Sequence, residues 1–275
     1  MPELPEVETT RRGIATIMPG HVLERFVVYE PRMRWPIPAD LPDRINGRQV
    51  ISCERRGKYL LINFDHGTQI IHLGMSGSLR RAPPDEDRRK HDHAEWIFGH
   101  ARFLLHDPRR FGAVLWHDAA DGPIAAHPLL AKLGIEPFDE LFTPEYLHKN
   151  LQGKTLAIKQ ALLAGHIVVG VGNIYASEAL FRARINPRTP AGTVSLARCK
   201  ALAAAIRQTL GDALESGGST LRDYVNATGQ PGAYFQLHAA VYEKSGKPCT
   251  VCATPIRRII QGQRASYFCP KCQRR

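Results

Sequence analysis

Residues 249–272 carry the most decisive pattern, Cys249-Thr250-Val251-Cys252 followed after sixteen residues by Cys269-Pro270-Lys271-Cys272. Each pair can hold a metal ion as a knuckle, and two pairs at this spacing predict a tetrahedral thiolate site for one Zn²⁺. Because all four ligands come from the protein, the predicted zinc is structural. A redox role is disfavoured, since no βαβ pattern surrounds the pairs. The intervening residues 256–268 predict a β-hairpin with projecting arginines, whose folding the metal drives.

The net charge of the chain indicates what kind of molecule it binds. The chain has 275 residues, a formal charge of +11 and a pI near 9.6, which favours a polyanion such as nucleic acid over a merely basic protein. The length predicts two domains, or two with a small module. We find no apolar run long enough to span a membrane and no signal peptide, so we expect a cytoplasmic protein without disulfides. Cys53 and Cys199 are then predicted to be buried thiols.

Periodicity divides the chain into a strand-rich part and a helical part. A helix is expected after Pro5, ending at Gly20. Short strands with turn signals then run to about Asp118, with hairpins around 65–67 and 99–100, which predicts a β-sandwich or barrel. After about Leu129 the spacing changes to that of helices, over 155–164, 174–183 and 196–214. In the last of these, the apolar stripe is expected to pack in a core: Leu196, Cys199, Leu202, Ile206 and Leu210.

The N-terminus offers an unusual nucleophile. Removal of Met1 would leave Pro2 with a free secondary amine, and an α-amino group titrates near ~7.8 against ~10.4 for lysine. Such an amine is a candidate for Schiff-base chemistry, because its adduct with an aldehyde is a cationic iminium. Glu3 places a carboxylic acid beside it for proton transfer. The alternative is an ordinary start in which Pro5 and the acids open a helix.

Further motifs suit nucleic acid but are individually weak. Gly170-Val171-Gly172-Asn173 lacks the features of a dinucleotide fingerprint or a P-loop, and it is interpreted as a turn with Asn173 near a helix N-cap that could receive a phosphate. Lys58 lies between two strands. Arg110 beside Phe111, together with Met75 at a glycine-rich turn, suits a protein that enters a DNA groove and props bases apart. The alternatives are a solvated lysine, a turn arginine and a core methionine.

Taken together and in order, these segments resemble bacterial formamidopyrimidine-DNA glycosylases, the family of 8-oxoguanine repair enzymes. The matching segments run from end to end: residues 2–8, 72–77, 90–93, 107–112, 170–175 and the four-cysteine ribbon. Compared with the related endonuclease VIII group, the block around Leu4 and the set Met75, Arg110 and Phe111 look like the enzymes that act on oxidised purines.

The resemblance implies an α+β multidomain fold. It comprises an N-terminal β-sandwich with a flanking helix over residues 2–130, a helix-two-turn-helix DNA-binding domain over 131–235, and a four-cysteine zinc-finger β-hairpin over 236–275. It also implies a cytoplasmic monomer that is associated with the nucleoid when it acts, with no role for a membrane.

The resemblance further implies a bifunctional DNA glycosylase and AP lyase of base-excision repair. Its partner would be double-stranded DNA that contains oxidised purines or abasic sites. Pro2 would attack C1′ of the damaged nucleotide and form a Schiff base, and β- and δ-elimination would then cut the strand. By match to the family pattern, Glu3 assists ring opening, Lys58 acts in base excision and β-elimination, and Arg264 acts in δ-elimination.

Other family positions imply DNA binding. Met75, Arg110 and Phe111 would fill the space left by an extruded base, since a base inside a duplex is unreachable. The residues implied to hold the backbone are His91, Arg110, Lys154, Asn173 and Arg264. Lys159 competes with Lys154 for this assignment, and residues 217–232 resemble the family's lid over the flipped base.

Two other interpretations stay open from the sequence. One is an endonuclease VIII-type glycosylase for oxidised pyrimidines. The other is a non-enzymatic zinc-ribbon DNA-binding protein, which the charge and the four cysteines alone would support.

Overall fold

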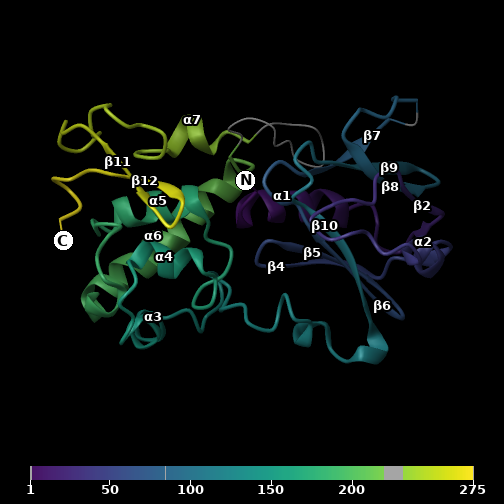
Figure 1. The fold of residues 1–275 in the computed structure, drawn as a ribbon, viewed down its shortest axis with the longest axis horizontal. Helices are drawn as coiled ribbons and strands as arrows, with labels where there is room; N and C mark the ends of the chain where they lie inside the picture. The colour runs from purple at the N-terminus through teal and green to yellow at the C-terminus, as the bar shows by residue number, and fades with distance from the viewer. Residues whose placement is uncertain (1, 84, 220–231, 275) are drawn as a thin grey trace. The chain divides into compact units, whose positions relative to one another are not determined.

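The computed structural model describes residues 2–83, 85–219 and 232–274 (Figure 1). The chain forms two compact units. Unit 1 consists of Met1–Ala131 with Leu214–Phe235, and unit 2 consists of Lys132–Ala213 with Gln236–Arg275. Among the described residues, no helix combines the length and the apolar character that a membrane crossing requires.

Unit 1 contains two four-stranded antiparallel sheets (Figure 1). The first has the order β10-β6-β5-β4, formed by Ala113–Asp118, Gly67–His72, Tyr59–Phe64 and Ser52–Arg56. The second has the order β2-β8-β9-β7, formed by Arg25–Val28, Asp92–Phe98, Ala101–His106 and Ser78–Ala82. Both predicted hairpins are confirmed, because Phe64 pairs with Gly67 and Phe98 with Ala101 across two-residue turns. Shorter elements are β1 (Val22–Leu23), β3 (Arg48–Gln49) and α2 (Leu41–Ile45).

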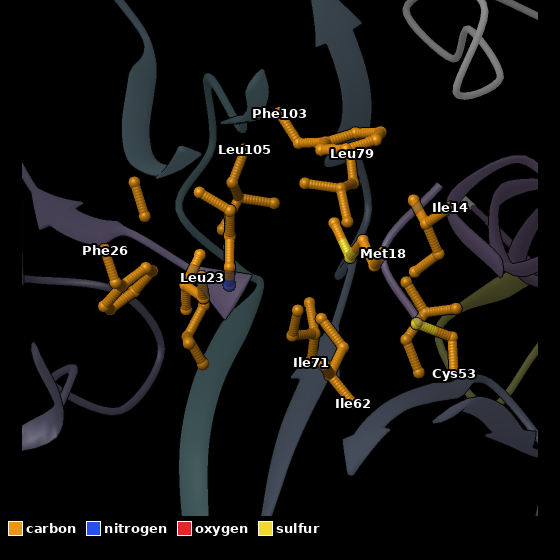
Figure 2. Close-up of a cluster of buried hydrophobic side chains, with 14 of the residues drawn as sticks. Ile14, Met18, Leu23, Phe26, Cys53, Ile62, Ile71, Leu79, Phe103 and Leu105 are labelled. Carbon is orange, nitrogen blue, oxygen red and sulfur yellow. The ribbon is translucent and has the colours of Figure 1, made fainter. Parts of the chain in front are cut away.

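The apolar faces of both sheets meet in one core, so the predicted β-sandwich is confirmed. Figure 2 shows Leu79, Phe103 and Leu105 of one sheet in the same cluster as Ile62 and Ile71 of the other. Burial of each such large apolar side chain stabilises the fold by roughly 1.5–3 kcal/mol. A polar link joins the two layers as well.

That link is formed by two buried side chains. The indole Nε1 of Trp96, in β8, donates a hydrogen bond of 2.8 Å to Oε1 of Gln69 in β6. The flanking helix α1, Leu4–Ala15, adds Val7 and Ile14 to the same core. Cys53 lies in the core too, as predicted, and burial raises the pKa of its thiol to about 12.

Unit 2 is mainly helical, with α3 (Pro144–Leu151), α4 (Ile158–Leu163), α5 (Asn173–Arg182) and α6 (Leu196–Glu215). The stripe predicted on α6 is buried at Cys199, Leu202, Ile206 and Leu210. Leu196 was predicted to join them and is exposed, because it is the first residue of the helix. A 3₁₀ turn of unit 2 covers Ala191–Thr193, two more in unit 1 cover Ala119–Asp121 and Ile124–Ala126, and a short helix α7 spans Tyr234–His238.

The zinc-finger hairpin consists of β11 (Arg257–Gln261) and β12 (Arg264–Phe268). Gly262 and Gln263 join the strands, and both have positive φ values, 53° and 63°. Positive φ at both central residues is typical of the type I′ turn, whose twist matches that of the strands. The hairpin predicted for residues 256–268 is thus confirmed, and Arg264 lies directly after its turn.

Candidate active site and DNA-binding residues

The N-terminus of unit 1 is held by a reciprocal pair of glutamates. Glu3 is the N-cap of α1, and its side chain and the side chain of Glu6 each accept a hydrogen bond from the other residue's backbone N–H. The bond from Glu3 N to Glu6 Oε2 is 2.8 Å long. Pro2, Glu3 and Glu6 are all buried. These hydrogen bonds fix the conformation of the backbone that directly follows Pro2.

Glu6 also reaches a distant part of the chain. Its second oxygen, Oε1, accepts a hydrogen bond of 2.6 Å from the backbone N–H of Ser219. A side chain on Gly218 would lie 3.1 Å from the same oxygen, so glycine suits this close approach. Sequence reasoning did not single out Glu6. The available signal was the three-residue spacing of a capping box, here with glutamate where Ser or Thr is usual.

Lys58 lies in the two-residue turn between β4 and β5, beside Gly57, whose φ is +59°. Its side chain is half-buried. His72, on the neighbouring strand β6, is mostly buried, and this burial together with the nearby charges of Lys58 and Arg34 lowers its pKa to about 4. His72 is therefore neutral at pH 7, and Lys58 and Arg34 supply positive charge beside it.

Two loops of unit 1 present apolar side chains to the surface. Met75 is 40% exposed and Phe111 is 43% exposed, so both side chains are accessible, as a base-filling wedge must be. The loops are held together, because a Cβ on Gly74 would lie only 2.4 Å from the backbone carbon of Phe111. The guanidinium of Arg109 lies over the Phe111 ring at 4.9 Å.

The buried carboxylate of Asp107 organises the second of these loops. It accepts hydrogen bonds from the hydroxyl of Ser76 (2.6 Å) and the N–H of Gly112 (2.8 Å). Arg110 adopts a left-handed backbone with a φ of 54°, and its exposed guanidinium lies 3.5 Å from Glu30. His91 is half-buried, with its ring 5.9 Å from that of His106.

In unit 2, the hairpin that carries Arg264 is fixed to the helices by a buried lysine. Lys159, in α4, is 1% exposed, and its ammonium donates to the carbonyl of Ala265 and the hydroxyl of Ser266, both at 2.9 Å. Asn173, the first residue of α5, donates to the same carbonyl at 3.1 Å. The structure thus brings Asn173 and the Arg264 segment together, while Lys154 is exposed in the turn after α3.

This geometry distinguishes the two lysines that compete for a phosphate contact. Lys159 uses its ammonium inside the protein, where a DNA backbone does not reach. Lys154 has an exposed side chain, which supports its assignment. Two other expectations cannot be compared with the geometry: Met1 and most of the predicted lid, residues 220–231, lie outside the described residues.

The four predicted cysteines form one cluster. Their sulfur atoms all lie within 4.8 Å of one another, with Cys252 Sγ 3.4 Å from Cys269 Sγ and Cys249 Sγ 3.9 Å from Cys272 Sγ. A tetrahedron with Zn–S bonds of about 2.3 Å has sulfur–sulfur edges of about 3.8 Å. Burial raises the pKa of the Cys272 thiol, whereas the hydrogen bonds of Thr254 lower the pKa of Cys252, and a bound cation favours the thiolate form of each ligand. The cluster fits, and binds, one structural zinc ion.

Comparison with known proteins identifies the family. Family models match residues 1–114 (formamidopyrimidine-DNA glycosylase N-terminal domain), 133–225 (formamidopyrimidine-DNA glycosylase H2TH domain) and 246–275 (zinc finger found in FPG and IleRS). The formamidopyrimidine-DNA glycosylase of Bordetella pertussis is 70% identical over 275 residues, which cover 100% of both chains. The chain belongs to the formamidopyrimidine-DNA glycosylase family.

Solved structures of this family share the fold. A Lactococcus lactis FPG variant in complex with DNA that contains Fapy-dG has a TM-score of 0.91 and 32% identity, with 100% of both chains covered. The wild-type Lactococcus lactis protein in complex with DNA that contains an oxidised pyrimidine has a TM-score of 0.90, again with 32% identity and 100% of both chains covered. Family membership makes this chain a DNA glycosylase of base-excision repair.

Proposed function

We propose that this protein removes oxidised purines, 8-oxoguanine and formamidopyrimidines among them, from double-stranded DNA and then cuts the strand at the resulting abasic site. The observation that carries the proposal is the N-terminus, where Glu3 and Glu6 lock the backbone next to Pro2. The catalytic amine requires removal of Met1, since a retained methionine would turn the nitrogen of Pro2 into an amide. The active species therefore begins at Pro2.

The chemistry follows from a secondary amine next to a carboxylic acid. The lone pair of Pro2 attacks C1′, the N-glycosidic bond breaks, and the base departs with its electron pair and a proton. Glu3 donates a proton to the ring oxygen O4′ as the sugar opens, which leaves an iminium between Pro2 and C1′. The iminium draws electrons from C2′, so a base can remove a proton there and expel the 3′ phosphate.

A second elimination then expels the 5′ phosphate. Lys58 is proposed to move protons during base excision and the first elimination, and Arg264 to serve the second. Their positions support these roles, because Lys58 lies at a sheet edge beside a neutral histidine and Arg264 directly follows the hairpin turn.

The proposed DNA contacts do not depend on the base sequence. Exposed Met75 and Phe111, with Arg110, would fill the space of the extruded nucleotide. Backbone phosphates would be contacted by His91 and Arg110 from unit 1 and by Lys154, Asn173 and Arg264 from unit 2. The damaged duplex is thus bound mainly through its backbone, with affinity that falls as salt rises.

We also propose that the three segments 2–130, 131–235 and 236–275 act as the catalytic, DNA-binding and zinc-finger parts of a monomer. Because its substrate is bacterial DNA, the protein would work in the cytoplasm and at the nucleoid. Membership of a glycosylase family rules out the non-enzymatic zinc-ribbon alternative.

Borohydride trapping on an 8-oxoguanine duplex tests the proposal. A covalent enzyme–DNA adduct that is lost in Pro2→Gly is expected, and the absence of any adduct with the natural N-terminus would reject the Schiff-base route. The oxidised-pyrimidine alternative has support, since a relative has been crystallised with such DNA. Excision rates from matched duplexes with 8-oxoguanine or thymine glycol separate the two, and a preference for thymine glycol would favour the alternative.

A further inference from the structure

A second basic site lies in unit 2, beside the zinc cluster, and the proposed function does not use it. A hollow of about 520 Å³ opens there. Its lining includes four cationic side chains from three parts of the chain: Arg184, Arg198, Lys271 and Arg274. The remaining lining residues are Cys252, Cys272 and Val251, so no acidic side chain borders the hollow.

Among the described residues, none of these four cationic side chains forms a salt bridge. By contrast, Arg182, two residues before Arg184, pairs with Asp212 at 2.7 Å. The charge of Arg182 is thus neutralised by a carboxylate, whereas the charges of the four cations that line the hollow are not.

Arg184 occupies a position that disfavours any residue with a side chain. Its φ is 55°, and it directly follows the C-cap of α5, Ala183. The N–H of Arg184 bonds to the carbonyl of Phe181 (3.0 Å) and the N–H of Ile185 to that of Leu180 (2.9 Å), which together form a Schellman motif. Glycine is the usual residue at this place. An arginine at this position strains the backbone, which suggests that its side chain has a function.

Neutralisation of the zinc cluster does not account for all the charge. Four thiolates with one Zn²⁺ carry a net charge of −2, and four cations carry +4. The hollow therefore keeps an excess of about two positive charges, enough for one dianion or two singly charged phosphodiesters. Arginine, which supplies three of the four cations, binds phosphate through two parallel N–H donors.

We propose that this hollow binds a backbone phosphate of DNA outside the segment that the hairpin turn contacts. Its volume exceeds that of a phosphate and admits the attached sugar, for which Val251, 63% exposed, provides an apolar wall. The cysteine knuckle follows β12, so it lies five residues, or about 15 Å, from Arg264. The contact would be independent of sequence and lesion.

The test compares two pairs of charge removals in the full-length, zinc-loaded protein. Arg184→Gly with Lys271→Gln removes two charges from the hollow, and the first change also relieves the left-handed backbone, so folding is retained. Lys132→Gln with Lys200→Gln is the matched control, since both lysines are exposed in unit 2 and neither lines the hollow. Binding to a long undamaged duplex is measured by fluorescence anisotropy from about 50 to 200 mM KCl.

Each lost phosphate contact lowers the slope of log affinity against log salt by about 0.9. Because the hollow is proposed to hold one phosphate, its variant should lose about 0.9 unit of slope, so that its affinity falls about 3.5-fold less than that of the wild type over that range. The control should keep nearly the wild-type slope, and excision from a short lesion duplex should be equal in all three proteins. This proposal rests on the proposed function, because it takes DNA as the partner. Excision from the short lesion duplex reports on the catalytic proposal and the salt slope reports on the hollow, so failure of one can be told from failure of the other.

Two outcomes would overturn the assignment. In the first, the hollow variant and the control share the wild-type slope. In the second, the salt slopes are again equal, but pyrophosphate raises the melting temperature of the wild type and not of the hollow variant. That result would assign the hollow to a free phosphate compound instead of DNA.

Discussion

Replacement of Glu6 by glutamine tests the account of the N-terminus. The wild-type carboxylate is 1% exposed and accepts hydrogen bonds from two backbone N–H groups, those of Glu3 at 2.8 Å and Ser219 at 2.6 Å. Glutamine has the same size, but one of its two terminal atoms is an NH₂ group that would face an N–H donor. One buried donor is left without an acceptor, and the other loses its charged partner.

The cost follows from the number of bonds. A buried donor left unsatisfied costs about 1–3 kcal/mol, and a hydrogen bond to a charged group contributes about 1.5–3 kcal/mol. We therefore expect Glu6→Gln to lower the free energy of unfolding by about 2–4 kcal/mol. Since a displacement of about 1 Å near the reacting atoms can cost about 100-fold in rate, Schiff-base formation by Pro2 should slow by about 10–100-fold.

Urea unfolding measures the first effect, and single-turnover borohydride trapping measures the second. Glu54→Gln is the control, because Glu54 is exposed and accepts hydrogen bonds from the nearby side chains of Ser52 and Asn63. A Glu6→Gln protein with the unfolding free energy and trapping rate of the control would refute the reasoning, since the two hydrogen bonds would then contribute nothing to the position of Pro2.

Three further predictions concern other parts of the chain. Lys159→Met should remove the bonds that hold the Arg264 strand and lower δ-elimination several-fold relative to β-elimination, measured as the ratio of the two cleaved ends; an unchanged ratio would contradict it. Because burial depresses the pKa of His72 to about 4, the unfolded chain takes up this proton first, and stability is lost as pH falls from about 6.5 towards 4. Between pH 7 and 5 the wild type should lose about 2 kcal/mol more than His72→Gln in urea unfolding, and equal losses would count against the buried neutral imidazole. Zinc chelation should expose the four clustered thiols to a thiol reagent and leave Cys53 and Cys199 unreactive, whereas rapid reaction of all six would show that the metal stabilises the whole chain.

Local patterns predicted much of the fold, because they report on local causes. The hairpins around 65–67 and 99–100 follow from short, mainly apolar runs on each side of two-residue turns. The zinc cluster follows from ligand spacing, which must match a tetrahedron. The one residue misplaced in the α6 stripe, Leu196, lies at a helix end, where periodicity no longer determines burial.

Residues whose role depends on distant partners could not be predicted. Glu6 bonds to a backbone group 213 residues away, and Lys159 to a strand more than 100 residues away. Arg184 is unusual only because its backbone is left-handed, which no sequence pattern revealed. The catalytic and DNA-binding roles of the predicted site residues depend in turn on a substrate, so they remain predictions for the experiments above.

The most direct test of the central claim is to locate the trapped sugar. Protein with its natural N-terminus is reduced with borohydride on an 8-oxoguanine duplex, digested, and analysed by mass spectrometry. The account predicts that the peptide beginning at Pro2 carries the residual deoxyribose, and that protein retaining Met1 gives no adduct. An adduct on Lys58 or another lysine, or an unaltered yield with Met1 retained, would contradict the claim that the Pro2 amine is the nucleophile.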